Sequence, residues 1–159
     1  MIIHMSKSLL VLFLLLVACK TSQELAMEST ETTFLVIDSG VLYGAGEEGF
    51  ESGAYLINSI EEMEKILLKM NSVNSYTINL EYQSTYFHDH TIIFLFDEVR
   101  GSAGHTFELK KIDKNEKGLI LKVKRSQPEG MAASVMTQPF QVIEIPKQNG
   151  SLELEVISP

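Results

Sequence analysis

The segment TIIFLF, at residues 91–96, restricts the fold more than any other part of the sequence. It carries no charged side chain, and it lies between His90 and Asp97. A strand with one face in water alternates polar and apolar residues, whereas a strand covered on both faces is apolar throughout. We therefore expect a central strand here, with a packed layer on each side.

Alternating apolar residues predict further strands, because side chains two residues apart lie on the same face of a strand. The apolar members of these sets are Tyr76, Ile78, Leu80 and Tyr82; Phe107 and Leu109, leading to Ile112; Leu119, Leu121 and Val123; Phe140, Val142 and Ile145; and Leu152, Leu154 and Val156. An earlier strand is expected at residues 34–37, continuing or restarting at 41–43. Residues 113–118 (DKNEKG) and 146–150 (PKQNG) are predicted turns.

One amphipathic helix is predicted to begin after Ser59. The sequence SIEE at residues 59–62 is a capping box, in which the Ser59 side chain accepts a hydrogen bond from the backbone of Glu62 and Glu62 reaches back. The apolar residues that follow recur at helical spacing and form one stripe: Ile60, Met63, Ile66, Leu67 and Met70. We expect this stripe to pack against the strands and the helix to end at Asn71.

These elements predict a single α+β domain at residues 34–159. It should be mostly antiparallel β-sheet, with six or more strands in a sandwich or partly open barrel and one packed amphipathic helix. A domain of roughly 130 residues can bury about two-thirds of its surface, so it does not need a disulfide to be stable.

The N-terminus contains an apolar run of ten residues, at positions 9–18, followed by the only cysteine, Cys19. A helix needs about 20 apolar residues to cross a bilayer, so this run predicts a signal peptide rather than a membrane span. Residues 16–19 (LVAC) resemble the lipobox of bacterial lipoproteins. That resemblance implies cleavage before Cys19, a diacylglycerol on its thiol and acylation of its new amino group, for example by palmitate.

The lipobox divides the N-terminal part into a signal peptide at residues 1–18 and, after Cys19, a polar stretch to residue 33. This stretch is rich in Ser, Thr and Glu, which predicts a flexible tether at residues 19–33. The protein would then be lipid-anchored to a membrane of a bacterial cell envelope. In the lipoprotein family, an aspartate after the cysteine retains many members at the inner membrane; Lys20 stands here, so we expect the outer membrane.

The composition argues against several function classes. The chain has 13 basic and 21 acidic residues and a formal net charge of −8, which opposes binding to nucleic acid and electrostatic attraction to anionic lipid. Once Cys19 is lipidated, no cysteine remains for a disulfide, a thiolate metal site or a nucleophile. The sequence contains no pattern that predicts a cofactor or a small-molecule substrate.

Residues 44–49 (GAGEEG) match the pattern G-x-G-x-x-G. A dinucleotide site would need a helix to begin here, with its N-terminus facing the pyrophosphate. The residues that follow do not indicate a helix, and Glu47 and Glu48 would repel phosphate. We therefore predict a glycine-rich turn.

The histidines leave a metal site as one alternative. His88 and His90 would share a face if they lay in one strand, and zinc needs at least three protein ligands. The only other histidine after Cys19 is His105, and nothing in the sequence places it near them.

Residues 100–105 (RGSAGH) leave a hydrolase as another alternative, because Ser102 lies close to His105. A triad also requires an acid that orients the base, and Asp97 and Asp89 are the available candidates. The segment is not the G-x-S-x-G elbow of many hydrolases. A simpler interpretation is a glycine-rich loop between two apolar strands, with a positive φ at Gly101 or Gly104.

From about residue 91 to residue 155, the chain resembles the C-terminal domain of the PrcB family, accessory lipoprotein subunits of bacterial surface protease complexes. The matching parts, in order, are the apolar strand at 92–96, the loop at 102–105 with Phe107 and Leu109 after it, the P-x-G turn at 128–130, and the strand that begins with Pro139-Phe140 and closes with Ile145-Pro146. Two positions differ from the family pattern: Ala103 replaces a glycine, and His105 replaces a tyrosine. The same loop is similar to the T-T-G-Y loop of chagasin-like cysteine-protease inhibitors.

The resemblance implies a lipid-anchored, non-catalytic envelope protein that binds a partner protein, such as a secreted protease, and supports its assembly or stability. Loops on rigid scaffolds often carry binding residues. The expected contacts with the partner are Arg100, Gly101, Ser102, Gly104 and His105. The alternatives are a chagasin-like protease inhibitor that uses the 100–105 loop, and a small hydrolase or metal protein that uses His88, His90 or His105.

Overall fold

The computed structural model describes residues 30–76 and 83–157, which form two four-stranded β-sheets and one α-helix. Sheet A has the strand order β1-β5-β6-β8, and sheet B has the order β2-β7-β4-β3. The elements are β1 Thr30–Glu31, β2 Leu35–Leu42, β3 Gly53–Ile57, α2 Ile60–Met70, the short 3₁₀ helix η1 Ser84–His88, β4 His90–Phe96, β5 Thr106–Asn115, β6 Gly118–Ser126, β7 Gln138–Pro146 and β8 Ser151–Ile157. This architecture confirms the predicted α+β class and the mostly antiparallel sandwich with one packed helix.

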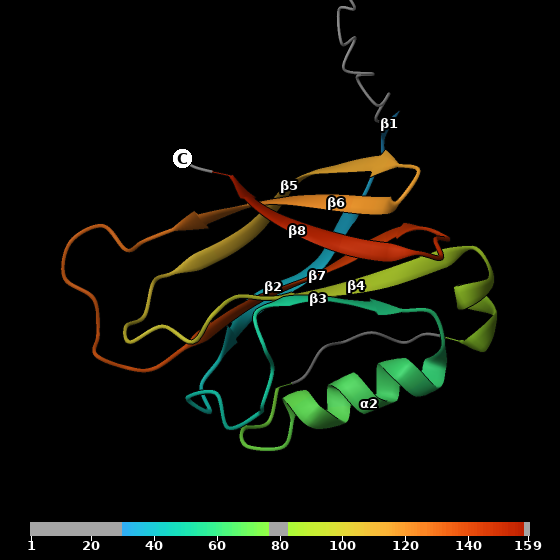
Figure 1. The fold of residues 1–159 in the computed structure, drawn as a ribbon. Helices are drawn as coiled ribbons and strands as arrows, with labels where there is room; N and C mark the ends of the chain where they lie inside the picture. The colour runs from blue at the N-terminus through green and yellow to red at the C-terminus, as the bar shows by residue number, and fades with distance from the viewer. Residues whose placement is uncertain (1–29, 77–82, 158–159) are drawn as a thin grey trace, which may run out of the picture.

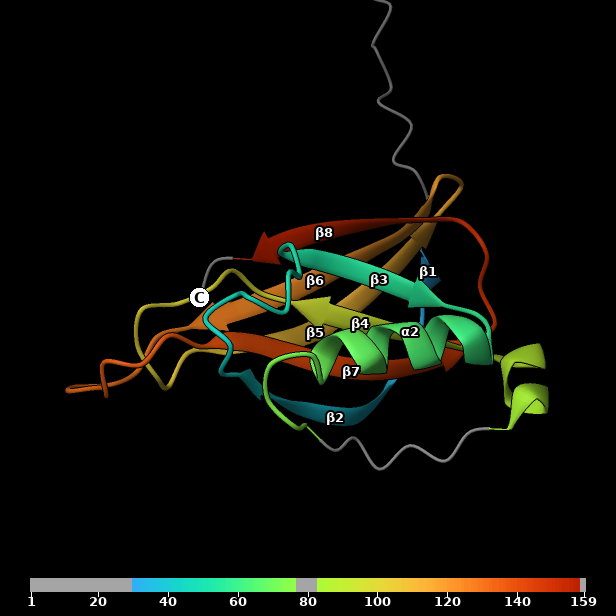
Figure 2. The same cartoon turned by 90° about the horizontal axis from the view of Figure 1, so that it is seen from below.

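Strand β4 lies between two packed layers, as its apolar sequence predicts. Ile92, Phe94 and Phe96 belong to the core that sheet B shares with α2. Ile93 and Leu95 point the other way and belong to the core between the two sheets. All five side chains are fully buried. The layers follow in the order α2, sheet B and sheet A (Figures 1 and 2).

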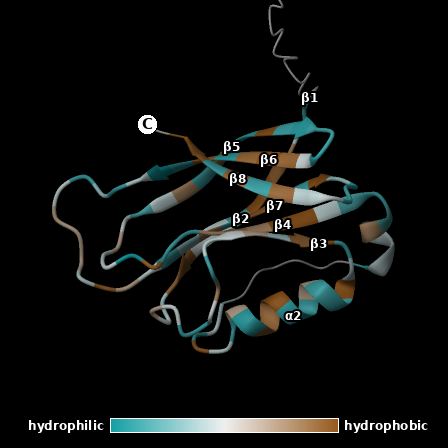
Figure 3. Ribbon diagram, in the orientation of Figure 1, coloured by the Kyte–Doolittle hydropathy of each residue, from teal (hydrophilic) through white to brown (hydrophobic). Residues whose placement is uncertain are grey.

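Helix α2 begins and ends where the sequence predicts. Ser59 is the N-cap, and its hydroxyl accepts a hydrogen bond of 3.2 Å from the backbone of Glu62. The Glu62 carboxylate reaches back one residue further than a standard capping box, to the backbone N–H of Asn58. Asn71 is the C-cap. Figure 3 shows hydrophobic and hydrophilic residues alternating along α2; those buried against sheet B are Met63, Ile66 and Met70.

Strand β8 is the exception to the antiparallel pairing, because it runs parallel to its neighbour, β6. The turn at residues 147–150 does not form a hairpin, since β7 belongs to sheet B and β8 to sheet A. The chain therefore crosses from one sheet to the other and enters the free edge of sheet A in the same direction as β6.

Two element boundaries also differ from the predictions, and one predicted strand lies mostly outside the described residues. Thr30 and Glu31, predicted as part of the tether, pair with Lys114 and Asp113 of β5. The predicted turn at 113–118 is shorter, because the strands continue to Asn115 and resume at Gly118. The strand predicted at residues 76–82 lies outside the described residues except for Tyr76, which is not in a strand.

The sandwich has two distinct ends. We call one the loop end: the segments at residues 97–105 and 127–137 lie there side by side, on the left in Figure 1. We call the other the hairpin end: it carries the β5–β6 turn and the β7–β8 turn, on the right in Figure 1. The predicted contact loop is therefore at the loop end.

Candidate functional site

The 100–105 loop is braced against the segment that precedes β7. Arg100 and Thr137 form an antiparallel bridge with backbone hydrogen bonds of 2.7 and 2.9 Å. The Thr137 hydroxyl donates to the carbonyl of Ser102, and the N–H of Ala103 donates to the carbonyl of Ala133, both at 3.0 Å. These contacts hold two loops together that are about 30 residues apart in sequence.

Gly104 fixes the return of the loop towards β5. Its φ is +85°, and a Cβ built there would lie 2.9 Å from the side chain of Pro128. The predicted positive φ is therefore confirmed at Gly104, where both the conformation and the close approach favour glycine. Gly101 has neither a positive φ nor a neighbouring atom within 4 Å of such a Cβ.

A buried carboxylate organises the base of this site. Asp97 is 1% exposed, and its two oxygens accept hydrogen bonds from two guanidiniums. Arg100 donates from Nε at 3.0 Å and from Nη2 at 2.8 Å, and Arg125, at the end of β6, donates from Nε at 2.6 Å. Both arginines also lie within 3.5 Å of Glu98. The Arg100 head group, predicted as a partner contact, is thus held against acidic residues of its own chain and supports the loop.

Ser102 and His105 do lie together. The Ser102 Oγ and the His105 Nε2 share a hydrogen bond of 3.0 Å. His105 borders a cavity of about 400 Å³, whose other lining residues are Asp97, Arg100, Arg125, Ser126 and Gln127. Neither predicted orienting acid serves this pair: the Asp97 oxygens are taken by arginines, and Asp89 precedes the other end of β4.

Four exposed apolar side chains stand on the same loops, and we call them the loop-end patch: Val99, Met131, Val135 and Met136. Met131 is fully exposed, and Met136 is 49% exposed. The sequence interpretation did not select the three in the 131–136 segment (MAASVM), because an apolar segment outside any strand pattern can be either buried or exposed. Methionine side chains are flexible and polarisable, which suits them to protein-binding surfaces.

The structure separates the three candidate metal ligands. His88 closes η1, whereas His90 opens β4, so the two do not share a strand face. The His90 ring stacks on Tyr86 at 4.6 Å, and its Nε2 lies 3.5 Å from Glu144. His105 follows the opposite end of β4. Within residues 30–76 and 83–157, no group of three His, Cys, Asp or Glu side chains could hold a metal ion.

The glycine-rich segment at residues 44–49 is a turn, as predicted, and the Glu48 carboxylate of the same segment packs inside it. Glu48 is 3% exposed, and its Oε1 accepts a 2.9 Å hydrogen bond from the backbone of Gly44. Ala45, Gly46 and Gly49 all have positive φ values. A backbone N–H that could face a phosphate is therefore engaged by Glu48.

Cys19 and most of the predicted tether lie outside the described residues. Among the helices that the structure does describe, none has the length and apolar character needed to cross a bilayer. Comparison of the chain with protein-family models, with curated proteins and with solved structures gives no significant match.

Proposed function

We propose that this protein is a lipid-anchored, non-catalytic envelope protein that binds another envelope protein through its loop end. The proposal rests on the loop-end patch: four exposed apolar side chains on two loops that backbone hydrogen bonds join at Arg100–Thr137 and at Ala103–Ala133. Exposed apolar side chains favour association, because binding removes them from water.

The position of the patch supports the same role. Strand β1 reaches sheet A next to the tip of the β5–β6 hairpin, and the loop end is the opposite end of the sandwich (Figure 1). A chain anchored through Cys19 would thus present the loop end away from its point of attachment. The resemblance to the PrcB family points to a secreted protease as the partner, whose assembly or stability the protein would support.

The test is capture of the partner from solubilised membranes, identified by mass spectrometry. The variant Met131→Ser/Met136→Ser should lower recovery about tenfold or more, since the central apolar residues of an interface carry most of its binding energy. The matched control is Leu68→Ser/Val73→Ser, because these two side chains are also exposed and apolar but lie on α2 and just after it. Equal recovery with both variants would reject the loop-end patch as the binding surface.

The chagasin-like alternative is tested separately with the purified protein. Inhibition of a cysteine protease that depends on residues 100–105 would favour an inhibitor over an assembly partner. A captured protease that stays active in the complex would favour the assembly role.

A second candidate function is hydrolysis, and the Ser102–His105 hydrogen bond is the observation that favours it. A histidine that accepts the serine proton could activate Ser102 as a nucleophile. An active-site phosphonate probe distinguishes the two candidates. Labelling that Ser102→Ala abolishes would favour the hydrolase, whereas the binding proposal predicts no labelling of Ser102.

A further inference from the structure

The β5–β6 hairpin concentrates the positive charge of the protein. Residues 110–125 contain seven of the thirteen basic side chains and only two of the twenty-one acidic ones, Asp113 and Glu116. This segment has a formal charge of +5 in a chain whose net charge is −8. The negative net charge predicts no attraction of the whole chain to anionic lipid. The positive charge is nevertheless concentrated in this hairpin.

Ion pairs within the fold neutralise four of these seven basic residues, but not Lys124 on β6 or the two lysines at the tip. The paired residues are Lys110, Lys111, Lys122 and Arg125. Lys114 and Lys117 are exposed and form no ion pair within the described part of the chain. Lys114 donates a 2.9 Å hydrogen bond to the Gln148 side chain, and Glu116 and Glu31 are exposed acidic neighbours at the tip.

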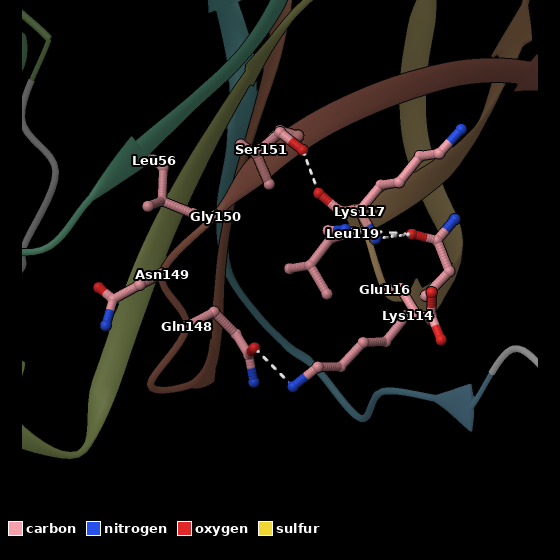
Figure 4. A pocket seen from close by; sticks show the side chains of 12 residues that line it. Leu56, Lys114, Glu116, Lys117, Leu119, Gln148, Asn149, Gly150 and Ser151 are labelled. Atoms are coloured by element: carbon pink, nitrogen blue, oxygen red, sulfur yellow. Dashed lines mark hydrogen bonds between the residues drawn. The ribbon is translucent and has the colours of Figure 1, made fainter.

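The two lysines border a cavity of about 210 Å³ between the β5–β6 turn and the turn before β8. Leu56, Leu119 and Leu152 provide its apolar lining, and Asn149 adds an amide. Figure 4 shows Lys114 extending across to Gln148, whereas Lys117 extends away from Gln148 and Asn149. Amines and amides above an apolar lining suit the phosphate and glycerol of a phospholipid headgroup.

The chain from Cys19 reaches the fold at this tip. Thr30 pairs with Lys114 and Glu31 pairs with Asp113 in antiparallel register, so the N-terminal end of β1 is the end nearest the turn. Ten residues separate Cys19 from Thr30. Even fully extended, a segment of that length spans only about 40 Å, so a lipid on Cys19 would keep the tip close to the bilayer surface.

We propose that the tip of the β5–β6 hairpin docks on an anionic phospholipid surface, with Lys114 and Lys117 against the lipid phosphates. This inference rests on the lipid anchor at Cys19 in the proposed function. An acyl anchor combined with basic side chains is a two-signal arrangement, in which the lysines orient a protein that the lipid already holds. Docking at the hairpin end turns the loop end away from the bilayer.

The test uses the mature lipidated chain in bilayers of phosphatidylcholine, alone or mixed with phosphatidylglycerol. Backbone hydrogen exchange at residues 113–119 should slow about tenfold in the anionic bilayer only, consistent with the attraction of two lysines to an anionic surface. The tip variants Lys114→Glu/Lys117→Glu and, as a milder change, Lys114→Gln/Lys117→Gln should lose this slowing. The control Lys65→Glu/Lys124→Glu changes the net charge by the same amount as the first variant, but its residues lie on α2 and towards the far end of β6. This control should keep the slowed exchange.

Equal exchange in the two bilayers, or slowing that persists in a folded tip variant, would overturn the inference. Thermal melting identifies which of the two tip variants is folded. Mass spectrometry of Cys19 in the same sample shows which proposal has failed. If Cys19 carries the lipid and hydrogen exchange is not slowed, only the docking is rejected. If Cys19 is unmodified, both the anchor and the docking are rejected. The tip variants should capture the partner as well as the unmodified chain does. Partner binding is therefore measured independently of membrane docking.

Discussion

At the scale of single residues, Asp97 joins the loop end to the body of the sandwich. Its carboxylate is buried and accepts hydrogen bonds from Arg100 in the loop and Arg125 on β6. We predict that Arg125→Met lowers the free energy of unfolding by about 2 kcal/mol, because a buried carboxylate loses a charge-assisted hydrogen bond. A denaturant-unfolding cycle with Asp97→Asn should show strong coupling between the two positions. A loss of less than about 0.5 kcal/mol in the free energy of unfolding would show that the hydrogen bonds from Arg100 are sufficient for the Asp97 carboxylate.

Asp113, on the outer face of sheet A, should make stability depend on acid pH. Hydrogen bonds from the Lys111 and Lys122 ammonium groups hold the pKa of Asp113 below its ordinary value. A carboxyl whose pKa is lowered by folding stabilises the native state above its unfolded pKa, about 3.9, and this stabilisation is lost as the pH falls through the lowered value. We predict that Asp113→Asn is less stable than the unmodified chain at pH 7 and that the difference shrinks towards pH 2. Denaturant unfolding across this range measures it, and a pH-independent difference would contradict the assignment.

At the scale of elements, the 100–105 loop depends on one glycine and not on the other. Gly104→Ala should cost about 1–2 kcal/mol, because alanine is strained at φ +85° and its Cβ would meet Pro128. Gly101→Ala is the matched control, since no atom lies within 4 Å of the added Cβ and its φ is not positive. It should change stability by less than about 0.5 kcal/mol in the same thermal-melting series. Equal costs at the two positions would show that the observed loop conformation does not govern stability.

The elements that the sequence predicts well are those whose local pattern reflects burial. The unbroken apolar segment of β4 predicts cover on both faces, and the capping residues with their apolar stripe predict α2. The parallel placement of β8 could not be predicted, because a strand has the same alternation whichever neighbour it joins. Arg125 was missed as a partner of Asp97 because the two are 28 positions apart and meet only through the strand order.

The candidate site was predicted in part. The spacing of Ser102 and His105 indicated that they could meet, and they do. The loop-end patch was missed because exposed apolar residues in a loop have no periodicity that distinguishes them from a buried segment. Only the folded chain shows that Met131 points into solvent and that the segment before β7 lies beside the 100–105 loop.

For the molecule as a whole, both the proposed anchoring and the outward position of the loop end depend on a tether through Cys19. We predict that Cys19→Ser blocks both lipidation and cleavage, so that the precursor keeps residues 1–18 and runs as a larger species. Intact-mass spectrometry of the purified protein distinguishes the two forms. An unmodified Cys19 thiol in an uncleaved chain would reject the lipobox assignment and the anchoring that depends on it.

Site-specific photo-crosslinking in intact cells tests whether the loop end binds another envelope protein. A photoreactive residue at Met131, in the loop-end patch, should capture one envelope protein reproducibly. The same residue at Glu153, which is exposed on β8 of sheet A, serves as the control and should capture nothing above background. Capture of the same protein from both positions, or from neither, would reject the loop end as the binding surface.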